Sequence, residues 1–182
     1  MAEITYTDKD KNATAGTDQT LWKDADANEV KASVNHLYDV IGYGLYASLV
    51  TPTKTVIALA NTYYPISGSF TNVPAVGFEL TATPGIKFTG TKTAYFEATF
   101  YASFKSDTNN TTVKIGLKKN GVIETSSEIY AFCKTMNELY TVSGNVVCSL
   151  ETDDELQIVV STDTAGDVTF QNITTKISNF IV

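Results

Sequence analysis

The sequence predicts an all-β fold, an antiparallel β-sandwich of the jelly-roll type, preceded by a short N-terminal helix. Apolar and polar residues alternate along several segments between residues 94 and 161. Each of the 4 prolines lies at or before the boundary of a predicted strand. With 182 residues, of which 43% are hydrophobic and 18% charged, the chain is expected to form one domain with a modest appendage.

The N-terminal residues 1–20 are rich in Thr, Asp, Lys, Gly and Asn and show no periodicity. They are therefore expected to be extended or disordered. Order is expected to begin at Leu21 and Trp22, which are candidates for docking on a partner protein. Residues 1–50 are predicted to form an N-terminal attachment segment.

A helix is predicted over residues 26–41, because Asp26 and Glu29 have the spacing of a capping box and an apolar stripe follows them. The stripe consists of Val30, Val34, Leu37 and Ile41. It fits either a short coiled-coil seam that contributes to a trimer interface or a helix packed on its own domain.

Residues 55–182 are predicted to form the sandwich, the head domain. The expected strands cover residues 55–61, 77–81, 85–89, 94–105, 111–118, 122–127, 129–133, 140–150 and 155–161, with a last, interrupted strand over 168–182. Asn120 and Gly121 predict a type I′ hairpin, because both positions of that turn need a positive φ angle. Strands with one apolar side must pair face to face, which predicts two sheets.

The segment AYFEATFYASF, residues 94–104, shows the alternation most clearly. Phe96, Phe100 and Phe104 share one face, and burial of each phenylalanine contributes about 1.5–3 kcal/mol to folding. Tyr95 and Tyr101 lie on the opposite face. Tyrosine offers ring area without charge, so these two residues are predicted to pack on a neighbouring copy of the chain.

The charge balance argues against nucleic acid as a ligand. All 13 basic residues are lysines, they stand against 20 acidic ones, and the formal net charge is −7. Without arginine, the bidentate recognition of phosphates and base edges is missing. The polar N-terminus lacks the apolar core of a signal peptide, and no apolar run could span a bilayer. The sequence therefore predicts a soluble product made in the cytoplasm, without membrane insertion.

Few residues suggest chemistry. His36 is the one histidine, so neither a histidine-rich zinc site nor a triad with a spare histidine can be built. Cys133 and Cys148 are expected to be reduced, buried thiols, and a disulfide between them is the alternative. No cofactor is predicted, and the chain is not expected to be an enzyme.

The acidic residues are interpreted mainly as solvated turns. Asp153, Asp154 and Glu155 form a local run before a strand, which does not supply two carboxyl groups facing each other across a groove. Calcium binding by Asp153, Asp154, Asp163 or Asp167 is the alternative, although their spacing matches no defined loop motif.

Several segments resemble known families. TLWKDADANEVKASVNHLYDVI resembles a segment that recurs in bacteriophage fibre and tail proteins. GIKFTGTKTAYFEATFYASF, TVKIGLKKNGV and LETDDELQIVV resemble the jelly-roll heads of the tumour-necrosis-factor and complement type, which also cap phage fibres. Together they cover residues 17–182. The resemblance implies a homotrimer around a threefold axis, with a displayed head and an N-terminal part docked on a capsid or tail protein. The lack of a collagen-like stalk favours the viral interpretation.

The first functional hypothesis is therefore a structural virion protein that displays a head for host attachment. The second is a carbohydrate-binding module that recognises host surface glycans, because jelly rolls commonly present aromatic platforms to sugars. The candidate stacking residues are Tyr63, Tyr64, Tyr130 and Tyr140. An enzyme is the third and last hypothesis, because the sequence offers no credible nucleophile or general base.

Overall fold

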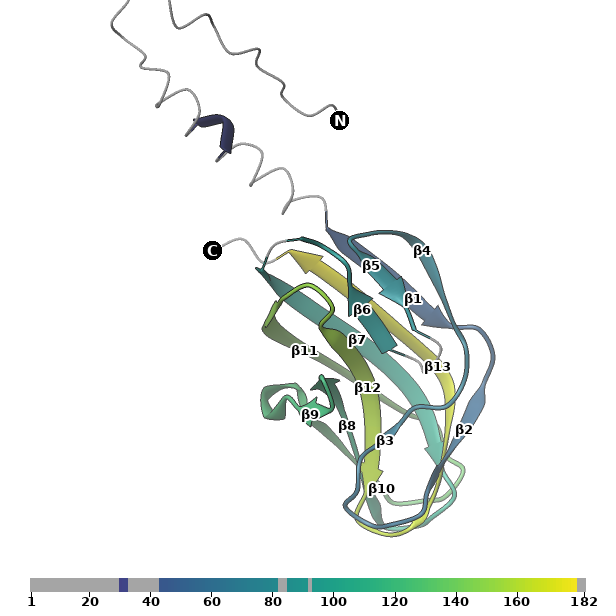
Figure 1. Ribbon diagram of the computed structural model, residues 1–182. Coiled ribbons are helices and arrows are strands. Elements are labelled where there is room, and N and C mark those ends of the chain that lie inside the picture. Colours follow the sequence, from purple (N-terminus) through teal and green to yellow (C-terminus); the bar gives the residue numbers. More distant parts are fainter. Residues whose placement is uncertain (1–29, 33–42, 82–84, 92, 180–182) are drawn as a thin grey trace, which may run out of the picture. The chain divides into compact units, whose positions relative to one another are not determined.

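The computed structural model describes residues 30–32, 43–81, 85–91 and 93–179 (Figure 1). The chain divides into two compact units, Met1–Gly42 and Tyr43–Val182. In the first unit, residues 30–32 are helical and the side chain of Val30 is exposed. The other residues of the predicted stripe, Val34, Leu37 and Ile41, lie outside the described residues, as do Leu21 and Trp22.

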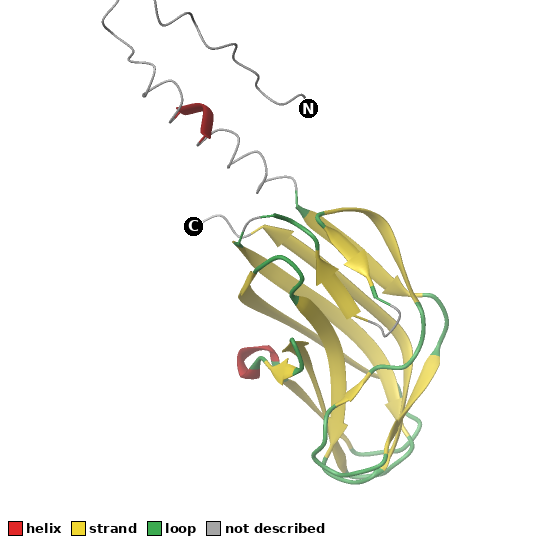
Figure 2. Ribbon diagram, viewed as in Figure 1, coloured by secondary structure: helices red, strands yellow, loops and turns green. Residues whose placement is uncertain are grey.

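The second unit is a sandwich of two antiparallel sheets, which confirms the predicted fold class (Figure 2). Sheet A contains β1 (Gly44–Leu49), β2 (Thr53–Ile57), β4 (Phe70–Val76), β7 (Ala94–Ser106), β11 (Tyr140–Leu150) and β13 (Gly166–Asn179). Sheet B contains β3 (Tyr64–Pro65), β5 (Phe78–Leu80), β6 (Gly85–Phe88), β8 (Thr111–Lys119), β9 (Val122–Ile123), β10 (Ile129–Cys133) and β12 (Glu155–Thr162).

The order of the strands in sheet A is β11-β7-β13-β1-β4, and β2 also pairs with β13. The order in sheet B is β10-β8-β12-β6-β5, with β3 on β12 and β9 on β8. Strands that are distant in sequence therefore lie side by side, as in a jelly roll. Within the described residues, no helix is long and apolar enough to cross a membrane.

The sandwich includes three strands that the sequence analysis does not predict, namely β1, β3 and β4. β1 lies before residue 55, where the predicted head begins. β4 contains Pro74, which cannot donate to a ladder, and it is tolerated because β4 is the edge strand of sheet A. The predicted strand over 122–127 is wrong in its second half, since residues Thr125–Ser127 form a 3-10 helix, η1. Asn120 and Gly121 have φ angles of 49° and 81°, as the predicted hairpin requires.

The core lies between the sheets and is rich in aromatic rings. Phe96, Phe100 and Phe104 are fully buried, which confirms the apolar face predicted for β7. The rings of Phe88 and Phe96 lie 5.0 Å apart at an angle of 60°, and the ring of Phe78 lies 5.2 Å from each of them. Such edge-on and tilted contacts add to the free energy gained from area burial alone. The two sheets are therefore joined by the aromatic face that the alternation predicts.

The centre of sheet A is β13, which pairs with β1 and β2 on one side and with β7 on the other. Its register on β7 shifts between Phe170 and Asn172, which marks a bulge. The odd positions of β7 remain on the outer face, so β13 and β7 together position the side chains of the candidate site.

Candidate functional site: the outer faces of the two sheets

The outer face of sheet A carries three exposed tyrosines. Tyr95 and Tyr101 of β7 are 56% and 40% exposed, and Tyr46 of β1 is 46% exposed. In the ladder, Tyr101 lies between Ser143 of β11 and Thr174 of β13. The structure therefore places both tyrosines predicted for a trimer interface on one outward surface.

We call this surface the β7 face and define it by the outward residues that surround the three tyrosines on four neighbouring strands, which leaves out Lys105 near the end of β7. They are Tyr46 and Ser48 of β1; Tyr95, Glu97, Thr99 and Tyr101 of β7; Ser143, Asn145, Val147 and Ser149 of β11; and Thr174, Lys176 and Ser178 of β13. Its charged members are Glu97 and Lys176, and the Glu97 carboxylate accepts a hydrogen bond from Asn145 Nδ2 at 3.1 Å. The β7 face is thus rich in tyrosine and small hydroxyl residues and poor in charge.

The outer face of sheet B differs in its charge. Lys87 lies on this side and pairs with Asp153 at 2.7 Å, while Lys114 and Lys118 project from β8. Glu155 of β12 lies opposite Lys87 in the ladder. Charged residues are depleted in the core of protein interfaces, so the β7 face is the better candidate for contact with another chain.

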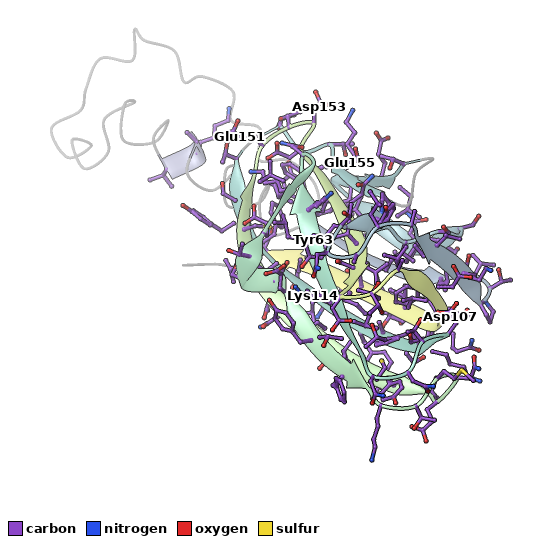
Figure 3. All side chains as sticks on the ribbon, turned by 90° about the horizontal axis from the view of Figure 1, so that it is seen from below. Tyr63, Asp107, Lys114, Glu151, Asp153 and Glu155 are labelled. Carbon is purple, nitrogen blue, oxygen red and sulfur yellow. The ribbon has the colours of Figure 1, made fainter. Side chains whose placement is uncertain are left out.

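A second group of residues lies on the outer face of sheet B, and we call it the tyrosine–glutamate cluster: Tyr63, Lys114, Glu128 and Tyr130. The Tyr63 hydroxyl donates to Glu128 Oε1, and the Tyr130 hydroxyl donates to Glu128 Oε2 at 3.3 Å. Lys114 Nζ lies 5.8 Å from the centroid of the Tyr130 ring, a cation–π contact. Figure 3 labels Tyr63 and Lys114 in this group.

The electrostatics of the cluster keep both tyrosines protonated. Burial, followed by the hydrogen bond to Glu128, raises the pKa of Tyr63 above its usual value. The charge of Glu128, followed by partial desolvation, raises the pKa of Tyr130. Both hydroxyls therefore remain donors to the carboxylate at physiological pH.

Two of the four predicted stacking tyrosines are used within the fold. The Tyr64 hydroxyl accepts a hydrogen bond from the Leu59 amide at 3.0 Å. The Tyr140 ring stacks on Phe104 with centroids 6.2 Å apart, and its hydroxyl accepts from the Thr135 amide at 3.1 Å. The structure thus joins Tyr63 and Tyr130 in one cluster and gives Tyr64 and Tyr140 structural contacts.

The acidic turn before β12 is held by hydrogen bonds from three sides. Asp154 accepts from Lys119 Nζ at 2.9 Å, from Asn120 Nδ2 at 2.6 Å and from the Glu151 amide at 2.8 Å. Burial opposes ionisation of Asp154, but these donors outweigh it and lower its pKa. Asp153 and Glu151 of this turn are labelled in Figure 3. Through Asp154, the turn therefore links the hairpin at Asn120 to the start of β12.

The aspartates offered as calcium ligands divide between the two ends of β12. Asp153 and Asp154 precede this strand, whereas Asp163 and Asp167 follow it. Each has a protein partner. Asp153 pairs with Lys87 at 2.7 Å and Asp154 with Lys119 at 2.9 Å. Asp163 accepts a hydrogen bond from Thr111 at 2.7 Å, and Asp167 pairs with Lys54 at 2.6 Å. In the part of the chain that the structure describes, no three His, Cys, Asp or Glu side chains are grouped to hold a metal ion.

The two cysteines are free and buried, which confirms the expectation of reduced thiols. Burial raises the pKa of both Cys133 and Cys148 to about 11. At neutral pH they are therefore thiols rather than nucleophilic thiolates.

Comparisons with known proteins show the fold. No protein-family model and no curated protein matches the sequence. Among solved structures, Eiger TNF from S. frugiperda matches with 8% identity and a TM-score of 0.53, over 76% of this chain and 94% of that one. Murine APRIL matches with 11% identity and a TM-score of 0.52, over 75% of this chain and 98% of that one.

A third match is PRD1 vertex protein P5, with 17% identity over 78% of this chain and 99% of that one. Its TM-score of 0.42 is too low to establish a shared fold. From the first two likenesses and the two-sheet topology, this chain has a jelly-roll sandwich of the tumour-necrosis-factor type.

Proposed function

We propose that this chain is a structural virion protein, a short homotrimeric fibre that docks by its N-terminal segment on the capsid or tail of a phage. Its jelly-roll head is displayed for host attachment or decoration. The resemblance of the segment around Trp22 to phage fibre and tail proteins supports the viral assignment, and the tumour-necrosis-factor type of fold supports the trimer.

The β7 face is the observation that carries the proposal. Three exposed tyrosines stand among small hydroxyl residues, and Glu97 and Lys176 are the charged members of its defined set. Aromatic enrichment with charge depletion is the composition of an interface core. Tyrosine also loses little conformational entropy when it is buried, because few bonds rotate in its side chain. We therefore place the contacts between the three copies on this face.

We further propose that the protein catalyses no reaction. The thiols of Cys133 and Cys148 are the strongest nucleophiles among the described side chains, and their burial and raised pKa values keep them unreactive. The protein's role is then carried by its shape and its surfaces.

The mass in solution tests the trimer. Sedimentation velocity of the full chain should give a species of about 59 kDa, three times the 19.7 kDa of one chain. A single species at the monomer mass at micromolar concentration would refute the trimer. Immunogold labelling of phage particles with antibodies against the head then tests the location, and unlabelled particles would refute a virion role.

Binding of a host surface glycan is a second proposed function, and it can coexist with the first. The tyrosine–glutamate cluster favours it, because an exposed ring lies beside hydroxyl, carboxylate and ammonium groups in one place. Aromatic rings with a few polar groups that fix orientation are typical of such sites.

A further inference from the structure

The tyrosine–glutamate cluster is built from three separate parts of sheet B. Lys114 lies on β8, Tyr130 on the neighbouring edge strand β10, and Glu128 directly after η1. Tyr63 comes from the segment just before β3, 65 positions from Glu128 in the sequence. A hydrogen bond between residues so distant in sequence fixes the cluster relative to the sheet.

Glycine at position 116 allows the segment with Glu128 to lie close to the sheet. A Cβ on Gly116 would stand 3.2 Å from Ile123 Cδ1 and 3.5 Å from Glu128 Cγ. Gly116 also pairs with Val159 of β12, whose side chain is fully buried. Glu128 thus packs close to Gly116 and accepts hydrogen bonds from two tyrosine hydroxyls, so its carboxylate is preorganised.

Tyr130 supplies the exposed ring of the cluster. It is 58% exposed, and Lys114, its direct partner in the β10–β8 ladder, lies over the ring. A phenol ring has two faces, and β10 is the edge strand of sheet B in the described order. The face of the ring away from Lys114 can therefore receive a flat apolar patch of a ligand.

A buried hydroxyl lies on the same side of the sheet, separated from this ring by Lys114 of the intervening strand β8. Ser161 pairs directly with Lys114 in the β12–β8 ladder, so the two side chains share the outer face. The residue is 1% exposed, and its Oγ has no hydrogen-bond partner within the described residues. Buried hydroxyls in native proteins are nearly always paired with protein or with ordered water, so the Ser161 hydroxyl adds a polar group beneath the cluster.

The charges of the cluster restrict the ligand. Lys114 already occupies the cation position on Tyr130, so a ligand ammonium would be repelled by it. A ligand carboxylate or phosphate would be repelled by Glu128 and attracted by Lys114, and an ammonium the reverse, so the cluster favours neither sign of charge. The two formal charges cancel, and the carboxylate retains lone pairs beyond the two that accept tyrosine hydroxyls. An uncharged ligand rich in hydroxyl groups satisfies all of these conditions.

We propose that the tyrosine–glutamate cluster binds a neutral pyranose, the terminal sugar of a host surface glycan. An apolar face of the sugar ring stacks on Tyr130, its hydroxyls donate to Glu128, and Lys114 donates to the ring or hydroxyl oxygens. This inference deepens the proposed glycan-binding function by naming the residues and the chemical class, and it does not depend on the trimer.

Ligand-observed NMR titration of the full chain tests the site. The neutral probes are the methyl glycosides of glucose, galactose and mannose, and the charged probes are N-acetylneuraminic acid and phosphocholine. At least one neutral probe should bind saturably, with a Kd on the order of 1 mM. Tyr130→Ala should weaken that binding about tenfold or more, because the stacking surface is lost. Glu128→Gln should weaken it as well, because the charge-assisted acceptor becomes a neutral amide.

Phe132→Ala is the matched control, since Phe132 lies two positions along β10 on the same face and is 60% exposed. Its removal should leave the Kd of the probe unchanged within about twofold. Absence of binding by all neutral probes, tighter binding of a charged probe, or an equal loss in Phe132→Ala would overturn the proposal. Thermal melting of each variant separates a lost site from a lost fold.

Sedimentation velocity of the same samples separates this inference from the trimer. A monomeric protein that binds the sugar would overturn the trimer alone, whereas a trimer that binds none of the neutral probes would overturn the sugar site alone.

Discussion

Truncation of Tyr101 to alanine gives the sharpest test of the β7 face. Tyr101 lies on β7 next to β13, the central strand of sheet A, and it is 40% exposed in the single chain. It has no core function, because its side chain points away from Phe100 and the sandwich interior. Tyr101→Ala should therefore weaken association while leaving the fold of the head intact.

The size of the effect follows from the exposed area. An aromatic side chain buries about 150–250 Å², so the exposed part of Tyr101 is about 80 Å². Burial of this area in a trimer contributes about 2 kcal/mol per copy at about 25 cal/mol per Å², or about 6 kcal/mol for three copies. Loss of that energy lowers the association constant of the trimer by a factor of about 10⁴. Because the midpoint concentration of a monomer–trimer equilibrium varies as the square root of this constant, it should rise about 100-fold.

Sedimentation velocity over a concentration series measures this midpoint for the wild-type chain and for Tyr101→Ala. The matched control is again Phe132→Ala, which removes a similarly exposed ring from the other sheet. If Tyr101→Ala associates at the wild-type midpoint, or if Phe132→Ala shifts it equally, the trimer does not form through the β7 face. An unchanged circular-dichroism spectrum establishes that each variant is folded.

Three further predictions concern the head domain. Gly144→Ala should lower the free energy of unfolding by about 1–3 kcal/mol in urea titrations, because the new Cβ would stand 2.9 Å from Phe100 Cζ; an unchanged midpoint would contradict this packing. Cys133 and Cys148 should resist a thiol reagent at pH 8 until the chain unfolds, since a pKa of about 11 leaves about 0.1% thiolate; rapid labelling of the native protein would disagree. The pKa of Asp163 is lowered by its hydrogen bonds, so its contribution to stability is present above the unfolded-state pKa and is lost as the pH falls through the native one. Asp163→Asn should therefore flatten the decline in melting temperature between pH 5 and pH 2, and a profile identical to wild type would argue against it.

The strands that follow clear alternation could be predicted from the sequence. Phe96, Phe100 and Phe104 repeat at every fourth position and alternate with smaller apolar residues, so their common face needs no knowledge of the neighbours. β4 could not be predicted, because a proline such as Pro74 argues against a strand unless the strand lies at a sheet edge. The edge position of β4 in sheet A depends on its pairing with β1, which the local sequence does not reveal. The predicted strand ends were accurate where a hairpin residue with positive φ, such as Asn120, marks the turn.

The candidate sites were harder to predict, because they depend on register. Tyr140 is a candidate stacking residue in the sequence, and the β11–β7 register that sets it opposite Phe104, on which its ring stacks, could not be read from the sequence. No local sequence pattern marks Glu128 and Lys114 as site residues, since the contact of Lys114 with Tyr130 depends on the pairing of β10 with β8. A carboxylate two positions before a tyrosine, as in EIYAF, is too common a pattern to identify a site.

The position of β13 also has a consequence for how the protein is made. β13 is translated after all the other described strands, yet it separates β7 and β11 from β1 and β4 and is the partner of β2. A ribosome-bound chain that ends before Gly166 therefore holds two unjoined halves of sheet A with their hydrogen-bonding edges open. Since the β7 face includes outward residues of β13, a chain that ends before Gly166 cannot present the complete face.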